Sequence, residues 1–166
     1  YYLTDDIVLD DTKILNTGYT SYLCLNGHSI TCDSTVYYLY STTSLTITDC
    51  KGTGKIESTE SGGATIKNNK YLSIWGGTIL NSAGEDVIWA FPGTTTYVQD
   101  GNIESNNACG IYDFGGSKIQ IKGGTIKGTT GIEMRAGELI VEGGIIIGTG
   151  VPTTITPNGN GSTSHG

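Results

Sequence analysis

The sequence predicts an all-β protein in which a single chain winds into a parallel β-helix, a solenoid, of about six to seven coils. A short strand, a glycine-containing turn and a following isoleucine recur at a steady interval, and no helical stretch separates the copies. Glycine accounts for 26 of 166 residues, roughly twice its average usage of about 7%. The 36% hydrophobic and 15% charged content does not fit a disordered chain.

The repeat is clearest in the second half of the chain. Its four copies cover residues 72–79, 96–103, 119–126 and 139–146. Their second glycines are Gly77, Gly101, Gly124 and Gly144, so successive copies are 24, 23 and 20 residues apart. Weaker copies at 23–30 and 45–56 extend the pattern toward the N-terminus. Glycine suits these corners because a turn with positive φ strains any residue that carries a Cβ.

A second short strand follows each copy. These strands are expected at residues 64–66, 87–89, 110–112, 131–133 and 154–156. One unit cannot bury its own apolar face, so stacking of successive units is predicted. Alternation along the strands then predicts the inward columns. Their members are Leu72, Ile74, Ile79, Thr96, Val98, Ile103, Ile119, Ile121, Ile126, Leu139, Val141 and Ile146.

The chain is expected to form one β-helix domain over residues 1–156. Residues 1–13 would provide an N-terminal cap or first strand, and residues 157–166 have the polar composition of a C-terminal tail or linker. The abrupt, strand-like beginning favours a processed or excised piece of a longer protein.

The charge balance argues against nucleic acid and anionic membranes as partners. Nine basic and 16 acidic residues give a formal net charge of −7, and Lys and Arg form no run. The longest apolar stretches fall far short of the roughly 20 residues that span a bilayer, so membrane insertion is not expected.

The four cysteines, Cys24, Cys32, Cys50 and Cys109, form no C-x-x-C pair, and the two histidines do not complete a zinc pattern. A disulfide among the first three and a set of small buried thiols both remain open.

Residues 2–9, 23–31 and 45–56 resemble the opening coils of right-handed β-helix modules. Such modules belong to the pectate-lyase-like superfamily and occur in secreted or wall-attached surface proteins of Gram-positive bacteria. The resemblance implies a right-handed parallel β-helix and an extracellular or cell-surface location. It leaves activity open, because the superfamily includes lyases, hydrolases, adhesins and non-catalytic polysaccharide binders.

No catalytic residue is predicted. Lyases of this superfamily hold calcium with acidic residues and use a Lys or Arg as the base. The only arginine, Arg135, has Phe114 and Phe91 as its repeat-equivalent neighbours. Asp113, Glu133 and Lys122 lie nearby and could form a constellation with it, but no family motif surrounds them. Solvated outer charges are the favoured interpretation. The carboxylate pairs Asp100 with Glu104 and Asp113 with Glu133, which a glycosidase could use, lack a sequence signature as well.

Outward aromatic residues are the candidate binding features. Trp89, Tyr112 and Glu133 should form one outward column, and a second should hold Trp75, Gln99, Lys122 and Glu142. Aromatic rings with polar edges suit stacking on sugars, which gives four candidate carbohydrate-binding residues: Trp75, Trp89, Tyr112 and Tyr97. The alternative is that these rings simply cover the sheet. Asp49 and Asp100, at turns, are weak calcium candidates without a calcium-binding motif, and no other cofactor is expected.

The leading functional hypothesis is a non-catalytic extracellular module, of the stalk or adhesin type, that binds a polysaccharide or a host or neighbour surface glycan. A second hypothesis is self-association: a β-helix has open strand edges at both ends, so copies could stack end to end into a filament. A third is a calcium-dependent, pectate-type polysaccharide lyase.

Overall fold

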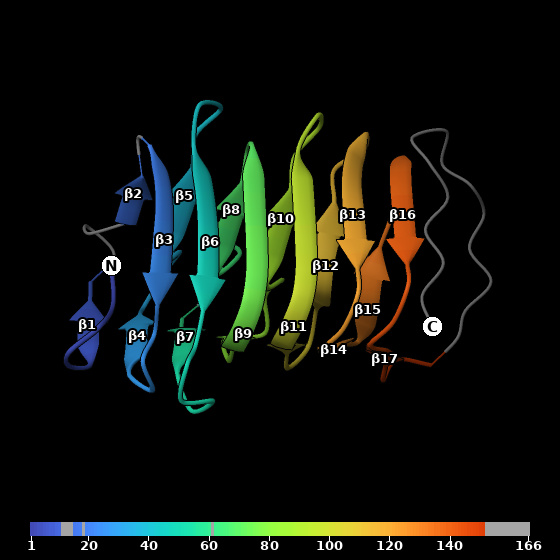
Figure 1. Ribbon diagram of the computed structural model, residues 1–166. Coiled ribbons are helices and arrows are strands. Elements are labelled where there is room, and N and C mark those ends of the chain that lie inside the picture. Colours follow the sequence, from blue (N-terminus) through green and yellow to red (C-terminus); the bar gives the residue numbers. More distant parts are fainter. Residues whose placement is uncertain (11–14, 18, 61, 152–166) are drawn as a thin grey trace.

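The computed structural model describes residues 1–10, 15–17, 19–60 and 62–151. These residues form 17 strands and no helix. The strands pair in parallel and stack as a β-solenoid of about six turns (Figure 1). The predicted all-β solenoid is therefore confirmed.

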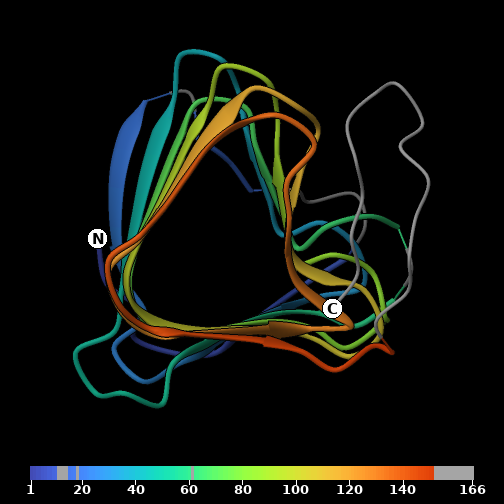
Figure 2. The same ribbon diagram turned by 90° about the vertical axis from the view of Figure 1, so that its right-hand side faces the viewer.

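Three faces surround a triangular interior (Figure 2). The first face holds β3 (Thr20–Cys24), β6 (Ser44–Thr48), the first halves of β9 (Tyr71–Asn81) and β11 (Thr95–Ser105), β13 (Ser117–Ile121) and β16 (Gly137–Val141). The second holds β1 (Ile7–Leu9), β4 (Ser29–Cys32), β7 (Lys55–Ser58), the second halves of β9 and β11, β14 (Thr125–Gly128) and β17 (Ile145–Gly148). Together they make one 11-stranded sheet.

The third face is a separate six-stranded sheet. Its strands are β2 (Leu15–Thr17), β5 (Tyr37–Leu39), β8 (Ile66–Asn68), β10 (Ile88–Ala90), β12 (Cys109–Asp113) and β15 (Thr130–Glu133). All of its pairings are parallel.

Inward side chains stack in columns because equivalent residues of successive coils pair directly. Leu45, Leu72, Thr96 and Ile119 follow one another in one such column. The predicted inward residues of the three inner copies are all fully buried: Leu72, Ile74, Ile79, Thr96, Val98, Ile103, Ile119, Ile121 and Ile126. Burial of each Leu, Ile or Val side chain contributes about 1.5–3 kcal/mol, so these columns are the main source of stability.

The inward residues of the last coil are less buried. Leu139, Val141 and Ile146 keep the expected register against Ile119, Ile121 and Ile126, yet they are 41%, 50% and 40% exposed. They belong to the terminal described coil, and an inward residue is covered only when coils lie on both sides of it. Their predicted place in the inward columns is therefore confirmed, although these side chains stay partly exposed at the end of the described coils.

The N-terminal segment contributes a strand to the solenoid. Strand β1 pairs in parallel with β4, with Ile7 opposite Ile30. Residues 11–13 of the predicted cap, the strand expected at 154–156 and the predicted tail at 157–166 lie outside the described residues.

The glycine corners bring successive backbones into contact. Gly124 has a φ of +77°, and a Cβ added there would lie 2.3 Å from the carbonyl oxygen of Gly101. Gly93 has a similar φ of +75°, but a Cβ there would meet nothing within 4 Å. Gly93 thus carries only the requirement for a positive φ, whereas Gly124 carries that requirement and also lies close to the neighbouring coil.

We predict that Gly124→Ala destabilises the protein by about 2 kcal/mol more than Gly93→Ala. Both substitutions impose the cost of a positive φ on alanine, but only Gly124→Ala also forces two coils apart. Urea denaturation followed by circular dichroism measures the difference. Equal losses of stability would contradict the close stacking of coils at this corner.

Candidate functional site

The four candidate aromatic residues lie on two different sheets. Trp75 and Tyr97 come from β9 and β11 on the first face, whereas Trp89 and Tyr112 come from β10 and β12 on the third. Trp89 and Tyr112 pair directly, as the sequence predicts. The two groups form two surfaces with different surroundings.

Trp75 presents an exposed indole ring on the first face. Its side chain is 52% exposed, and its Nε1 donates a hydrogen bond to Ser73 Oγ at 2.7 Å. The Tyr97 ring lies beside it, with a centroid distance of 6.2 Å and an interplanar angle of 46°. The Tyr97 hydroxyl donates to Gln99 Oε1 at 2.6 Å. The polar atoms of both rings are thus bonded locally, while the indole face stays accessible.

A hollow of about 230 Å³ opens beside Trp75, at the corner between the first and second faces. The other residues that line it are Asp49, Gly52, Gly76, Gly77, Asp100, Gly101 and Asn102. A wall of glycines leaves room at the corner, and the carboxylates and the amide supply hydrogen-bonding groups around it.

A register shift between β9 and β11 places Asp100 at this hollow. Val98 pairs with Ile74, but the next pairing joins Asp100 to Trp75 and skips Gln99. Gly101 permits the irregularity with a φ of +105°, as expected for glycine at a β-bulge. Asp100, and not the predicted Gln99, is therefore the strand neighbour of Trp75.

The carboxylates at the hollow have different roles. Asp49 accepts backbone hydrogen bonds from Gly27 at 2.8 Å and Gly54 at 2.6 Å, one on each oxygen, so it holds the turn. Asp100 is exposed and accepts a bond from the Gly101 backbone at 2.8 Å. Across the described ranges, no three or more His, Cys, Asp or Glu side chains gather as a metal site. Calcium binding by Asp49 and Asp100 stays a prediction.

The aromatic residues of the third face pack mainly against one another. Phe91 and Phe114 stack at 4.9 Å, and Trp89 and Tyr112 each meet Phe114 edge-on, at 5.4 Å and 4.8 Å. The Lys67 ammonium lies 4.9 Å from the centre of the Trp89 ring. Arg135 lies at the same distance over Tyr112. Lys67 and Arg135 thus occupy faces of the Trp89 and Tyr112 rings. This packing favours the interpretation that these aromatic residues cover the sheet.

Asp113 and Glu133 are not the solvated charges that the sequence suggests. Both are buried, with Asp113 fully inaccessible. The Asp113 carboxylate accepts backbone hydrogen bonds from Ser117 at 3.1 Å, Arg135 at 3.2 Å and Ala136 at 3.1 Å. Glu133 lies 3.7 Å from Arg135 Nε and 3.6 Å from the Cys109 sulfur. Asp113 therefore holds two successive turns together, a structural role.

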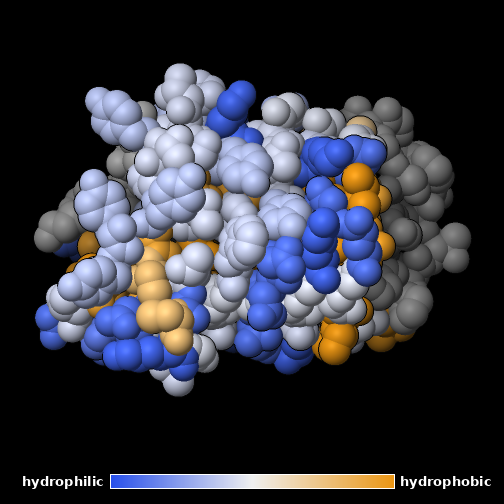
Figure 3. Space-filling view, viewed as in Figure 1, coloured by the Kyte–Doolittle hydropathy of each residue, from blue (hydrophilic) through white to orange (hydrophobic). Residues whose placement is uncertain are grey.

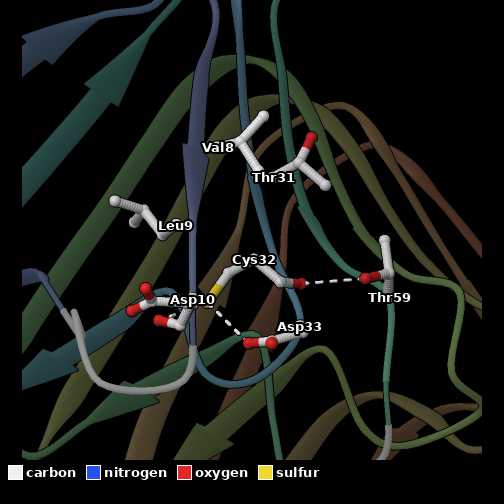
Figure 4. Close-up of a pocket in the computed structure, with 7 residues that line it drawn as sticks. All are labelled: Val8, Leu9, Asp10, Thr31, Cys32, Asp33 and Thr59. Carbon is white, nitrogen blue, oxygen red and sulfur yellow. Dashed lines mark hydrogen bonds between the residues drawn. The ribbon is translucent and has the colours of Figure 1, made fainter.

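A second hollow, of about 350 Å³, lies at the N-terminal end of the second face (Figure 4). Its lining consists of Val8, Leu9, Asp10, Thr31, Cys32, Asp33 and Thr59. The Cys32 sulfur points toward the Asp33 carboxylate at 3.8 Å, and burial raises the pKa of this thiol. The lining residues lie in or directly after β1, β4 and β7, and no sequence motif marks this hollow.

No protein family, no curated protein and no solved structure matches this chain. The strand pairing establishes the fold as a parallel β-solenoid. The pectate-lyase-like family and the bacterial cell-surface setting stay predictions. A search of the described residues for a helix that is long and apolar enough to cross a membrane finds none.

We predict that Asp113→Ala lowers the unfolding temperature by about 5–10 °C, because three buried or partly buried backbone hydrogen bonds lose their acceptor. The matched control is Asp100→Ala, which removes an exposed carboxylate and should change the unfolding temperature by less than about 2 °C. Differential scanning fluorimetry measures both variants. A comparable loss in the two would show that Asp113 does not hold the turns together.

Proposed function

We propose that this chain is a non-catalytic extracellular β-solenoid module that binds a polysaccharide on the first face, at Trp75. The observation that carries the proposal is the half-exposed indole beside a hollow rimmed by Asp49, Asp100 and Asn102. A flat apolar ring next to convergent polar groups is the combination that sugar recognition requires. The cell-surface setting and the stalk or adhesin role rest on the resemblance of the opening coils.

The arrangement suits a sugar that stacks on one side and hydrogen-bonds on the other. The C–H face of a sugar ring would lie on the Trp75 indole, and its hydroxyls would reach Asp100 and Asn102, both exposed. Hydroxyl and amide side chains continue along the neighbouring strands. Tyr22, Thr46, Ser73, Tyr97 and Gln120 pair across the first face in that order.

The charge of the site favours a neutral polysaccharide. Two carboxylates line the hollow, and the whole chain carries a net charge of −7. A polymer of uronic acids would be repelled unless cations bridged the charges. The negative charge therefore favours binding of a neutral glycan over a pectate-type lyase activity.

The exposed face in Figure 3 is consistent with contact with a hydrated polymer. Polar and weakly polar side chains cover most of this view, which has the orientation of Figure 1, and strongly hydrophobic ones are exposed beside β16. The first face is thus a mainly polar surface that carries isolated aromatic rings. The strongly hydrophobic side chains lie near one end of the solenoid, beside β16.

We predict that the wild-type chain is retarded in affinity gels that contain a neutral polysaccharide, and that Trp75→Ala weakens the binding at least tenfold through loss of ring stacking. Trp89→Phe serves as the matched control, because it changes the other tryptophan and keeps an aromatic ring in the third-face cluster. It should bind like the wild type, with an unchanged circular dichroism spectrum.

Two results would refute the proposal. One is the absence of retardation by every neutral polysaccharide in a panel. The other is unaltered binding of a folded Trp75→Ala variant.

A second candidate function is end-to-end self-association. The last described coil exposes an apolar surface made by Leu139, Val141, Ile145, Ile146 and Ile147, which are 36–58% accessible. At the opposite end, β1 pairs only with β4 among the described strands. Unpaired strand edges at both ends of the described solenoid, one of them beside an apolar surface, favour stacking of a second copy.

For this second function, we predict that the wild type forms oligomers whose size grows with concentration in sedimentation velocity, and that Val141→Lys remains monomeric. Tyr71→Lys, on the side of the cylinder, should behave like the wild type. A wild-type chain that stays monomeric at millimolar concentration would rule out stacking.

A further inference from the structure

Two of the four cysteines lie side by side on neighbouring coils. Cys24 is the last residue of β3, and Cys50 follows the end of β6. The two strands pair in parallel with Cys24 opposite Thr48. The Cys24 and Cys50 sulfur atoms are 3.2 Å apart. Cys50 is exposed and Cys24 partly exposed, so a reagent in solution can reach the pair.

The other two thiols have different surroundings. Cys32 and Cys109 are buried, and their sulfur atoms contact oxygen and nitrogen atoms of other residues. Cys32 lies 3.7 Å from the carbonyl oxygen of Asp10, and Cys109 lies 3.6 Å from a carboxylate oxygen of Glu133. Burial raises the pKa of both thiols, which keeps them protonated and unreactive. They serve as internal controls within the same chain.

The hydrogen bond between Cys24 and Cys50 makes the two sulfurs unequal. Desolvation, the largest single influence, raises the pKa of Cys24, but hydrogen bonds with Cys50, Thr48 and Asn26 together outweigh it, so the pKa of Cys24 lies below its ordinary value. The hydrogen bond with Cys24 raises the pKa of Cys50. Cys24 is therefore the thiol that more readily forms a thiolate and attacks a disulfide.

We propose that Cys24 and Cys50 form a reversible disulfide that staples the coil of β3 and β4 to the coil of β6 and β7. The oxidant is an organic disulfide, and a thiol reverses the reaction. The two sulfur atoms are 3.2 Å apart, so only a small further approach is needed to reach the S–S bond length of about 2.05 Å.

The exchange proceeds in two steps. The Cys24 thiolate attacks one sulfur of the organic disulfide, forms a mixed disulfide and releases the first organic thiolate, which takes up a proton. Cys50 then loses its proton and attacks the Cys24 sulfur, which breaks the mixed disulfide and releases the second organic thiolate. Overall, two protein thiols lose two electrons and two protons, and the organic disulfide is reduced to two thiols.

The staple would act on the coil that borders the hollow. Cys50 belongs to the turn between β6 and β7, and Asp49 and Gly52 of this turn line the hollow beside Trp75. The bond would close a loop between residues 24 and 50. Closing a loop of this length restricts the unfolded chain, and we expect the unfolding temperature to rise by about 5–10 °C.

The test begins with the full chain reduced by dithiothreitol, freed of reductant and treated with oxidised glutathione. Free thiols are then alkylated, first in the native and then in the unfolded protein, and the chain is analysed by mass spectrometry. Before alkylation, we expect the oxidised chain to be lighter than the reduced chain by two hydrogen atoms. After alkylation and proteolytic digestion, we expect a cross-linked peptide that joins Cys24 to Cys50, and alkylation of Cys32 and Cys109 only in the unfolded protein. The oxidised chain should melt above the reduced chain.

Cys50→Ser provides the matched control, because it leaves Cys24 without a resolving thiol. This variant should retain one glutathione on Cys24 and show no rise in unfolding temperature. In the wild type, persistent glutathione adducts, a cross-link through Cys32 or Cys109, or equal unfolding temperatures of the oxidised and reduced chains would each overturn the proposal.

Discussion

The structure depends on one constraint: each coil must return to the position of the previous one, displaced by the spacing of paired strands, about 4.8 Å. At that spacing several of the corners leave no room for a side chain. A Cβ at Gly124 would lie 2.3 Å from the Gly101 carbonyl oxygen, and one at Gly137 would lie 2.1 Å from that of Ser117. The glycine-rich composition is thus a direct consequence of backbone stacking.

The same constraint determines where a binding site can form. Regular stacking yields flat faces on which equivalent residues stand in rows, and such faces have few concave sites. The pairing of β9 with β11 departs from this regularity, because Trp75 pairs with Asp100 instead of Gln99. The departure brings a carboxylate to an exposed indole beside the glycine-walled hollow. The proposed sugar site therefore lies where the register shifts.

The fold could be predicted from the sequence because its determinants are local. Alternation and the spacing of glycines were sufficient to identify Ile74 and Ile121 as buried, as observed. Leu139 follows the same pattern but is exposed, since burial depends on a further coil and not on the residue itself. The structure also buries Asp113, whose backbone partners come from two turns, and no sequence pattern reveals such long-range contacts.

The candidate site was predictable only in part. Trp75 and Tyr97 are suggested by their outward positions, and the structure places them side by side. The strand neighbour of Trp75 was misassigned, because one bulged residue changes which side chains meet across a corner. Trp89 has the same sequence signature as Trp75, but its partners Phe91, Phe114 and Lys67 become visible only in three dimensions.

The most direct test of the binding proposal is a heteronuclear NMR titration of the chain with a neutral oligosaccharide. The two tryptophans give two indole N–H signals, which report separately on the first and third faces. The Trp75 indole signal and the backbone amide signals of Gly101 and Asn102 should shift together, while the Trp89 indole signal stays in place. Shifts confined to Trp89 and Tyr112, or no shift at any saccharide concentration, would contradict a sugar site at the register shift.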